Sequence, residues 1–208
     1  MSEATRPTAG IVLAAGRSLR LGRPKQLIPL RGKILLQWVL EAALASRLEH
    51  TVVVLGHEAS RIVTMLGELA NHPHLTILRN DNYDKGQTTS LHAGLKEVRG
   101  RFPAVMFLLG DQPLVDAEII DHLLEQFHAS DKDICVPLVN GKRSTPALFS
   151  ERFFDRIFAI TGDVGARTLI DDHPESVLRV AFQVSSRFLD VDDEHDLERL
   201  YGLVGTLA

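Results

Sequence analysis

The chain has 208 residues, 45% of them hydrophobic and 24% charged, a mixture typical of a folded globular domain and unlike that of disordered proteins. The formal net charge of −4 gives no electrostatic reason to expect binding to nucleic acid or to an anionic membrane. A single cysteine, Cys135, excludes an intrachain disulfide and a zinc site built from several cysteines. No segment approaches the roughly 18–20 apolar residues of a membrane span, and residues 1–8 lack the apolar centre of a signal peptide. We therefore expect a cytoplasmic protein with no nucleic-acid partner and no membrane partner.

Short apolar runs alternate with segments of helical periodicity along the first 130 residues. The runs that predict buried strands are 10–13, 51–55, 75–78 and 104–109. The segments whose apolar spacing predicts amphipathic helices are 36–44, 62–70, 88–98 and 120–127. Beyond residue 130 the expected strands are 134–136, 146–149 and 177–180, and the expected helices are 151–160, 164–171 and 194–203. This order predicts an α/β fold, with a mostly parallel sheet, helices on both faces and an antiparallel edge extension. We expect one domain over residues 9–208 behind a flexible tail over residues 1–8.

A loop rich in Gly and Arg follows the first expected strand. Its first three small residues, Ala14, Ala15 and Gly16, would let backbone amides approach an anion closely. Four cationic residues then gather in one loop of an acidic chain, which suggests a polyphosphate ligand: Arg17, Arg20, Arg23 and Lys25. The loop matches neither the P-loop nor the dinucleotide fingerprint, and a solvated basic loop is the alternative interpretation.

Carboxylates follow two later apolar segments. Asp111 comes directly after the run 104–109, and ligands of open α/β sheets bind beyond the carboxyl ends of the strands. A carboxylate beside phosphates is suited to holding Mg²⁺, although Asp111 could instead cap the turn before Pro113. Asp190 or Asp192 offers a second metal ligand, and N-capping of the last helix by Asp192 or Asp193 is the alternative.

The segment 80–91 combines Gly86 with hydroxyl residues at an expected helix start. Its amides and hydroxyls could contact a base, a ribose or a phosphate, or could simply cap the helix. Ser18 and Ser90 have no partner motif for nucleophilic catalysis, and the histidine spacing indicates no transition-metal site.

Five motifs, in this order, resemble those of the MobA-like nucleotidyltransferases, and within that superfamily those of the molybdenum cofactor cytidylyltransferase branch. They are Leu13-Ala14-Ala15-Gly16-x-Ser18-x-Arg20-x-Gly22-x-x-Lys25, Gly86-Gln87-Thr88-Thr89-Ser90-Leu91, Leu109-Gly110-Asp111-Gln112-Pro113-Leu114, Gly162-Asp163-x-Gly165-Ala166-Arg167, and Asp190-Val191-Asp192 with Asp196-Leu197. Two segments depart from the family pattern. Ser144-Thr145-Pro146 stands where Gly-His-Pro or Gly-Asn-Pro is usual, and Asp193-Glu194 stands where Thr-Pro is usual. The first departure puts the identity of the acceptor in doubt.

The resemblance implies a three-layer Rossmann-like nucleotidyltransferase fold and Mg²⁺-dependent transfer from an NTP, with CTP favoured, to the terminal phosphate of molybdopterin. Pyrophosphate would leave, and a molybdenum hydroxylase is the expected recipient of the product. The implied catalytic residues are Arg17, Lys25 and Asp111, and the implied metal ligands are Asp111 and Asp192. The implied nucleotide contacts are Leu13, Ala14, Ala15, Gly16, Arg17, Lys25, Asn80, Gly86, Thr88 and Ser90. The implied acceptor contacts are Gln112, Thr145, Asp163 and Arg167, where Arg167 could instead pair with Asp163 or Asp171.

Three other functions are compatible with the sequence. The same crevice could hold NAD(P)H in an oxidoreductase that acts on a small heteroaromatic compound. The chain could also be a non-catalytic factor that delivers a cofactor, although intact Lys25 and Asp111 argue against a degenerate site. Within the transferase class, the base could be guanine or adenine and the phosphorylated acceptor a different one.

Overall fold

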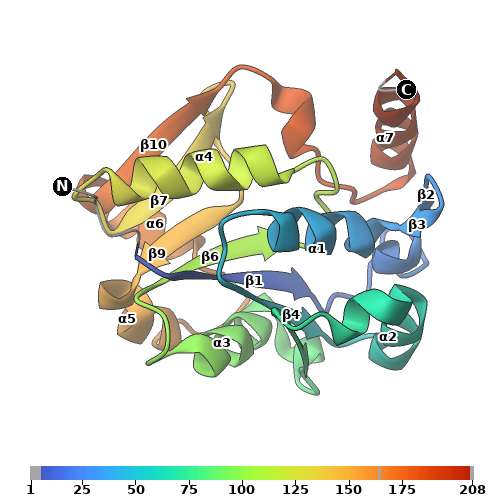
Figure 1. The fold of residues 1–208 in the computed structure, drawn as a ribbon, viewed down its shortest axis with the longest axis horizontal. Helices are drawn as coiled ribbons and strands as arrows, with labels where there is room; N and C mark the ends of the chain where they lie inside the picture. Colours follow the sequence, from blue (N-terminus) through green and yellow to red (C-terminus); the bar gives the residue numbers. More distant parts are fainter. Residues whose placement is uncertain (1–5, 164, 207–208) are drawn as a thin grey trace.

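The apolar runs of the sequence form the centre of a mixed sheet in a computed structural model that describes residues 6–163 and 165–206 (Figure 1). The strands of this sheet are β1 (Thr8–Ala14), β4 (His50–Leu55), β5 (Leu75–Arg79), β6 (Ala104–Leu109), β7 (Ile134–Val139), β8 (Lys142–Arg143), β9 (Ala147–Ser150) and β10 (Val177–Phe182). A separate hairpin pairs β2 (Pro29–Leu30) with β3 (Lys33–Ile34). Every residue of β1 except Leu13, and every residue of β4 except His50, is buried, as expected for strands covered on both faces.

The strand order is β10-β7-β9-β6-β1-β4-β5, with β8 paired to β7. The pairs β1–β4, β1–β6, β4–β5 and β7–β10 are parallel, which confirms a mostly parallel sheet. The expected extension of the sheet is joined by antiparallel pairing: β9 lies between β6 and β7 and is antiparallel to both, and the short strand β8 is antiparallel to β7. All four residues of β9 are buried, which is consistent with this interior position.

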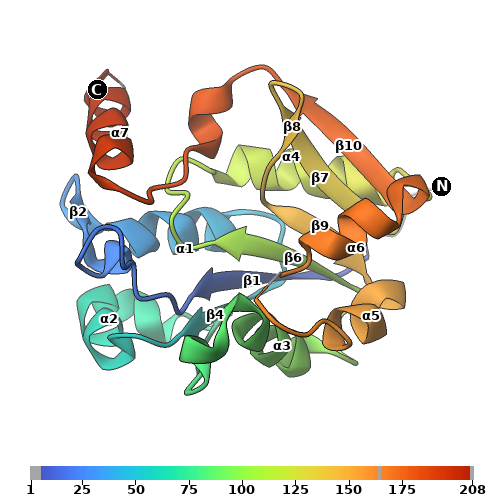
Figure 2. The same ribbon diagram turned by 180° about the vertical axis from the view of Figure 1, so that it is seen from behind.

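Helices cover both faces of the sheet, which gives three layers (Figures 1 and 2). On one face the core contains side chains of α1 (Leu35–Ala45), α2 (Ala59–Leu66) and α4 (Ala117–His128). On the other face it contains side chains of α3 (Gln87–Val98), α5 (Phe154–Phe158) and α6 (Arg167–Asp172). These two clusters bury the alternating side chains of the same strands, so the sheet is the rigid base from which the loops project.

A third, smaller apolar cluster lies at one corner of the molecule, and we call it the satellite core. It joins the hairpin β2–β3 to the last helix, α7 (Glu194–Thr206), which stands beside that hairpin in Figures 1 and 2. Its buried members are Leu21, Ile28, Leu30, Leu35, Leu189, Val191, Leu197, Leu200 and Val204. The Tyr201 hydroxyl donates to the Pro29 carbonyl over 3.1 Å, and Arg31 donates to the Val204 carbonyl.

Three of the expected helices differ in extent from the observed ones. The helix expected over 62–70 ends at Leu66, the one over 151–160 is reduced to α5, and the one over 164–171 begins at Arg167. Gly67, Gly162 and Gly165 have φ of 55°, 78° and 60°, a left-handed conformation that interrupts an α-helix. Residues 1–5 of the expected tail and Val164 lie outside the described residues, and β1 already begins at Thr8. No helix in the described ranges is long and apolar enough to span a bilayer.

Candidate active site

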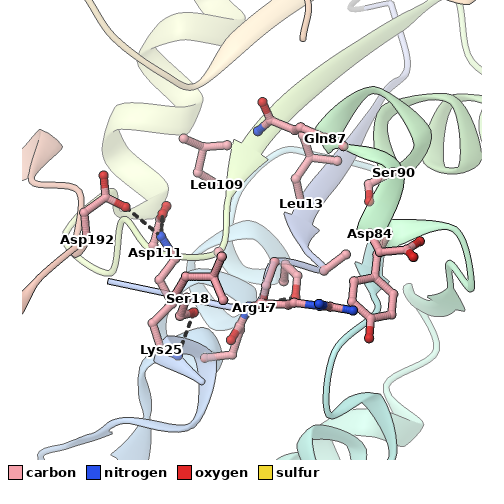
Figure 3. Close-up of a pocket in the computed structure, with 18 of the residues that line it drawn as sticks. Leu13, Arg17, Ser18, Lys25, Asp84, Gln87, Ser90, Leu109, Asp111 and Asp192 are labelled. Carbon is pink, nitrogen blue, oxygen red and sulfur yellow. Dashed lines mark hydrogen bonds and ion pairs between the residues drawn. The ribbon is translucent and has the colours of Figure 1, made fainter. Parts of the chain in front are cut away.

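A cleft of about 560 Å³ opens beyond the carboxyl ends of β1 and β6 (Figure 3). The sequence predicts a ligand site at this edge, because parallel strands there end side by side. Eleven of the predicted site residues line the cleft: Leu13, Ala14, Ala15, Gly16, Arg17, Lys25, Gly86, Ser90, Asp111, Asp163 and Asp192. The structure therefore brings together residues from all five motifs, and Asp192 represents the last of them.

Lys25 and two carboxylates form a charged cluster at one end of the cleft (Figure 3). The Lys25 Nζ contacts Asp111 Oδ2 and lies 3.0 Å from Asp192 Oδ1. The side chains of Lys25 and Asp111 are only 17% and 13% exposed, so water screens this contact weakly. Arg20 reaches Asp192 from the solvent side, with its Nη1 3.2 Å from Oδ2. Ion pairs thus join three segments that are far apart in the chain: the loop after β1, the turn after β6 and the segment before α7.

The charges of this cluster shift the pKa values of its members. Burial lowers the pKa of Lys25, but the charges and hydrogen bonds of Asp111 and Asp192 outweigh burial and hold it above its ordinary value. Partial burial raises the pKa of Asp192, while the stronger effects of Lys25 and Arg20 hold it below its ordinary value. Lys25 is therefore an ammonium and Asp192 a carboxylate at neutral pH.

Asp190 differs from Asp192 in its surroundings. The carboxyl of Asp190 loses part of its hydration to the surrounding chain and faces the negative charges of Asp111 and Asp192, which together raise its pKa to about 6. Asp190 does not line the cleft, whereas Asp192 does. Of the two candidates for a second metal ligand, Asp192 is the one whose position in the cleft lining would make it accessible to a cation.

The loop that follows β1 is held in shape by two side chains. Ser18, at a φ of 54°, accepts a hydrogen bond on its Oγ from the Lys25 amide over 3.1 Å. The Gln26 side chain is buried, and its Nε2 donates to the carbonyls of Ala14 and Gly16 over 2.9 and 3.1 Å. These contacts occupy carbonyl oxygens at the start of the loop, which favours a cleft surface suited to anions.

The opposite wall of the cleft is formed by the segment before α3 and by its first turn. Tyr83, Asp84, Gly86, Gln87 and Ser90 line this wall. The Arg17 guanidinium lies 5.5 Å from the centre of the Tyr83 ring, in reach of a cation–π interaction between the two walls.

Two residues predicted to contact the nucleotide lie behind this wall and do not line the cleft. Asn80 is buried, and its Nδ2 donates to Ser90 Oγ over 3.0 Å and to Thr89 Oγ1 over 2.8 Å. Thr88 is also buried. Asn80 therefore fixes the orientation of Ser90 and does not face the cleft itself.

The predicted acceptor residues are spread over a wider area. Asp163 lines the cleft and accepts a hydrogen bond from the Gln87 amide over 2.5 Å, at the N-terminus of α3. Gln112 is buried and accepts from the Thr145 hydroxyl over 2.8 Å, outside the cleft lining. Arg167 is exposed on α6 and is not among the cleft residues. Of the two partners suggested for it, Asp171 contacts Arg143 at 2.7 Å, and Asp163 accepts the hydrogen bond from the Gln87 amide.

Sequence reasoning missed several residues of the cleft. Gln26, Tyr83 and Asp84 were given no role, and Leu19 and Leu109 were not singled out. Gln26 stands directly before the apolar Leu27-Ile28 pair, but that local pattern does not show that its side chain is buried and hydrogen-bonded. Tyr83 and Asp84 carry no local signal either, since they lie in a polar segment.

Known proteins of similar sequence were compared with the chain. The purine catabolism protein PucB of Bacillus subtilis is 28% identical over 198 residues, which are 91% of this chain and 95% of PucB. The probable molybdenum cofactor guanylyltransferase of Thermococcus sibiricus is 29% identical over 151 residues, 71% of each chain. The nicotine blue oxidoreductase of Paenarthrobacter nicotinovorans is 28% identical over 199 residues, 92% of this chain and 95% of that one.

Solved structures show the same architecture. Rv0371c of Mycobacterium tuberculosis superposes with a TM-score of 0.83 at 28% identity, over 96% of this chain and 100% of its own. A manganese complex of Rv0371c has a TM-score of 0.78 at 26% identity, over 94% of this chain and 98% of its own. The profile of the MobA-like NTP transferase domain matches residues 10–177, which include four of the five motifs and most of the cleft. With its sheet, its cleft and its motifs in that arrangement, the chain belongs to the family of MobA-like NTP transferase domains.

Proposed function

We propose that this nucleotidyltransferase transfers a cytidylyl group from CTP to the terminal phosphate of molybdopterin. The observation that carries the proposal is the cluster of Lys25, Asp111 and Asp192 beside the small-residue loop that follows β1. Cationic and amide donors on one side and carboxylates on the other suit a polyphosphate that is bound together with a metal ion. The favoured base and acceptor come from the motifs of the cytidylyltransferase branch. A molybdenum hydroxylase that takes up the product in the cytoplasm is the partner this proposal implies.

The reaction needs positioning and charge stabilisation rather than a covalent nucleophile. An oxygen of the acceptor phosphate attacks the α-phosphorus in line, a new phosphorus–oxygen bond forms, and the bond to the pyrophosphate leaving group breaks. The amides of residues 14–17 and the side chains of Arg17 and Lys25 would stabilise the charge that moves to the leaving group. Both reacting phosphates carry ionised oxygens, so no strong base is required.

The cluster fits a hard divalent cation. Asp111 Oδ1 is buried and has no hydrogen-bond partner among the described residues, which leaves one carboxylate oxygen available as a ligand. Asp111 and Asp192 would hold the ion, since Mg²⁺ commonly takes one or two carboxylates together with phosphate oxygens and water. The ion would supply further neutralisation of phosphate charge. The manganese complex of Rv0371c supports a divalent metal in this family.

The acceptor contacts that we propose come from the loop before α6 and from the turn after β6. Asp163 closes one side of the cleft, and the hydrogen-bonded pair of Gln112 and Thr145 supports the turn after β6. We assign Gln112 and Thr145 a positioning role toward the acceptor, and Arg167 a contact with the acceptor's outer part. Substitution of Arg167 by alanine should then raise the KM for the acceptor and leave the KM for CTP unchanged.

The test is pyrophosphate release from CTP, GTP and ATP with molybdopterin and Mg²⁺. We expect release with CTP, and we expect Lys25→Ala and Asp111→Asn each to lower turnover by about 10²–10³, as loss of a charge stabiliser does. Lys33→Ala and Glu41→Gln are matched controls, because this lysine and glutamate form an ion pair outside the cleft lining. Turnover within threefold of wild type in both cleft variants would contradict the assigned roles. Turnover with GTP alone would move the chain to the guanylyl-transferring class of its Thermococcus relative.

A second candidate is an NAD(P)H-dependent oxidoreductase, which the similarity to nicotine blue oxidoreductase over 92% of the chain favours. A thermal-shift panel of CTP, GTP, ATP and NAD(P)H, each with and without Mg²⁺, separates the two candidates. A ligand at 100 times its Kd stabilises the fold by about 2.7 kcal/mol, which is readily visible. A response to NAD(P)H with none to CTP and Mg²⁺ would replace the transferase proposal.

A further inference from the structure

The position that a divalent cation would take is held by a residue of the chain itself. The Lys25 Nζ lies between Asp111 and Asp192 and contacts one carboxylate oxygen of each. We propose that Lys25 is the counter-ion of Asp111 and Asp192 before substrate binds, and that it leaves this position only when a nucleotide and its metal ion enter together. The inference rests on the proposed function for the identity of the cation ligands, and it adds an order of binding: a metal ion alone is excluded.

Electrostatics explains why Asp111 and Asp192 need such a counter-ion. Asp111 and Asp192 each have an oxygen in contact with the same nitrogen, so their negative charges are close together and repel each other. The mostly buried position of Asp111 weakens the screening by water. One ammonium between the two carboxylates reduces the local charge from −2 to −1. A divalent ion that arrives without nucleotide would have to displace this ammonium. Without a nucleotide, no phosphate oxygen is available to pair with the displaced Lys25 side chain.

The nucleotide provides that alternative partner. The Lys25 backbone is fixed by its amide hydrogen bond to Ser18 Oγ, so only the side chain needs to move. Lysine carries its charge on a flexible four-carbon chain, unlike the planar group of arginine. The loop of residues 14–20 lines the same cleft as Lys25, so phosphates bound along that loop lie within the same cavity as the ammonium. Lys25 would then exchange its contacts with the two carboxylates for contacts with phosphates, and Asp111 and Asp192 would be left to hold a metal ion.

Arg20 provides a matched comparison on the same carboxylate. It also contacts Asp192, but its side chain is 71% exposed, and it approaches from solvent and not from between the two carboxylates. Removing Arg20 therefore takes away one positive charge without opening the position between Asp111 and Asp192.

The experiment measures Mn²⁺ binding to the whole chain without nucleotide, by the loss of the free Mn²⁺ electron paramagnetic resonance signal. We expect weak binding to wild type, at least tenfold tighter binding to Lys25→Met, and binding to Arg20→Met within threefold of wild type. The double variant Lys25→Met/Asp111→Asn should lose the gain, which ties the gain to the carboxylates. Circular dichroism checks that each variant is folded.

Two results would overturn the inference. Mn²⁺ binding to wild type as tight as to Lys25→Met would show that the ammonium does not compete for the site. An absence of Mn²⁺ binding to both proteins would show that the carboxylates do not form a cation site. The wild-type measurement alone is decisive if Lys25→Met does not fold, because micromolar binding without nucleotide already contradicts the exclusion. Pyrophosphate release plays no part in this readout, so a failure of the proposed transferase activity is seen separately.

Discussion

Gly94 in α3 allows the helix to lie directly on the central sheet, and its substitution by alanine tests how tightly that contact is packed. A Cβ at this position would lie 2.4 Å from Ile11 Cγ2 and 3.1 Å from Val54 Cγ2, both closer than ordinary van der Waals contact. Ile11 and Val54 are completely buried in β1 and β4, so neither side chain can move into open space. Overpacking of this kind costs about 1–3 kcal/mol.

Helix propensity opposes this cost, because alanine is more favourable than glycine inside a helix by about 1 kcal/mol. The net expectation for Gly94→Ala is a loss of about 0–2 kcal/mol, with the upper end favoured by the 2.4 Å approach to Ile11 Cγ2. For a chain of this length each kcal/mol changes Tm by about 2–4 °C, so Tm should fall by up to about 8 °C. The matched control is Gly202→Ala in α7, where an added Cβ would meet no atom of the described residues within 4 Å apart from the backbone of its own helix, so no overpacking cost is expected.

Differential scanning calorimetry and urea unfolding of the three proteins measure both effects. We expect Gly94→Ala to unfold at lower temperature and lower urea concentration than wild type, and Gly202→Ala to be equal or more stable. If both variants gained stability by the same amount, α3 would not be packed against β1 and β4 as described, and the position of Ser90 and Gln87 at the cleft would need revision.

Three further predictions concern single contacts. Gln26→Glu cannot donate to the two loop carbonyls, so we expect nucleotide affinity to fall about tenfold in isothermal titration calorimetry; unchanged affinity would remove Gln26 from the site. The exposed pair of Arg23 and Glu194, at 2.9 and 3.0 Å, should show a coupling of about 0.2–1 kcal/mol in a double-mutant cycle, reduced in 1 M NaCl, and a salt-independent value would argue against an ion pair. Burial raises the pKa of the Cys135 thiol to about 12, so iodoacetamide should label it at pH 8 only after denaturation, and stoichiometric labelling of the native chain would contradict its burial.

The parts of the fold that sequence predicted well are those with a local signal. Continuous apolar runs such as 104–109 identified the central strands, and the rule that ligands bind at their carboxyl ends placed Asp111 at the cleft. The run 146–149 is too short to reveal its neighbours in the sheet. Its interior position between β6 and β7 depends on long-range pairing, which no local pattern encodes.

The candidate site likewise contains residues whose position follows from a local sequence signal and residues whose position depends on tertiary packing. Loop residues such as Gly16 and Arg17 line the cleft as predicted, because they follow a strand whose position was clear. Asn80 was predicted to contact the nucleotide, yet it is buried behind Ser90. Tertiary packing decides the direction in which such a polar side chain points, so the local sequence does not show it. The contact of Asp163 with the N-terminus of α3 joins residues 76 positions apart, and the sequence holds no sign of it.

The satellite core has a consequence for the synthesis of the chain. Its first half, within residues 21–35, leaves the ribosome well before its second half, within residues 189–204. At typical rates of 5–20 residues per second, the intervening stretch takes roughly 10–30 s to translate. During that interval the apolar side chains of Leu21, Ile28 and Leu30 have no α7 to cover them. The corner that later joins Lys25 to Asp192 is therefore completed only after residues 189–204 have been translated.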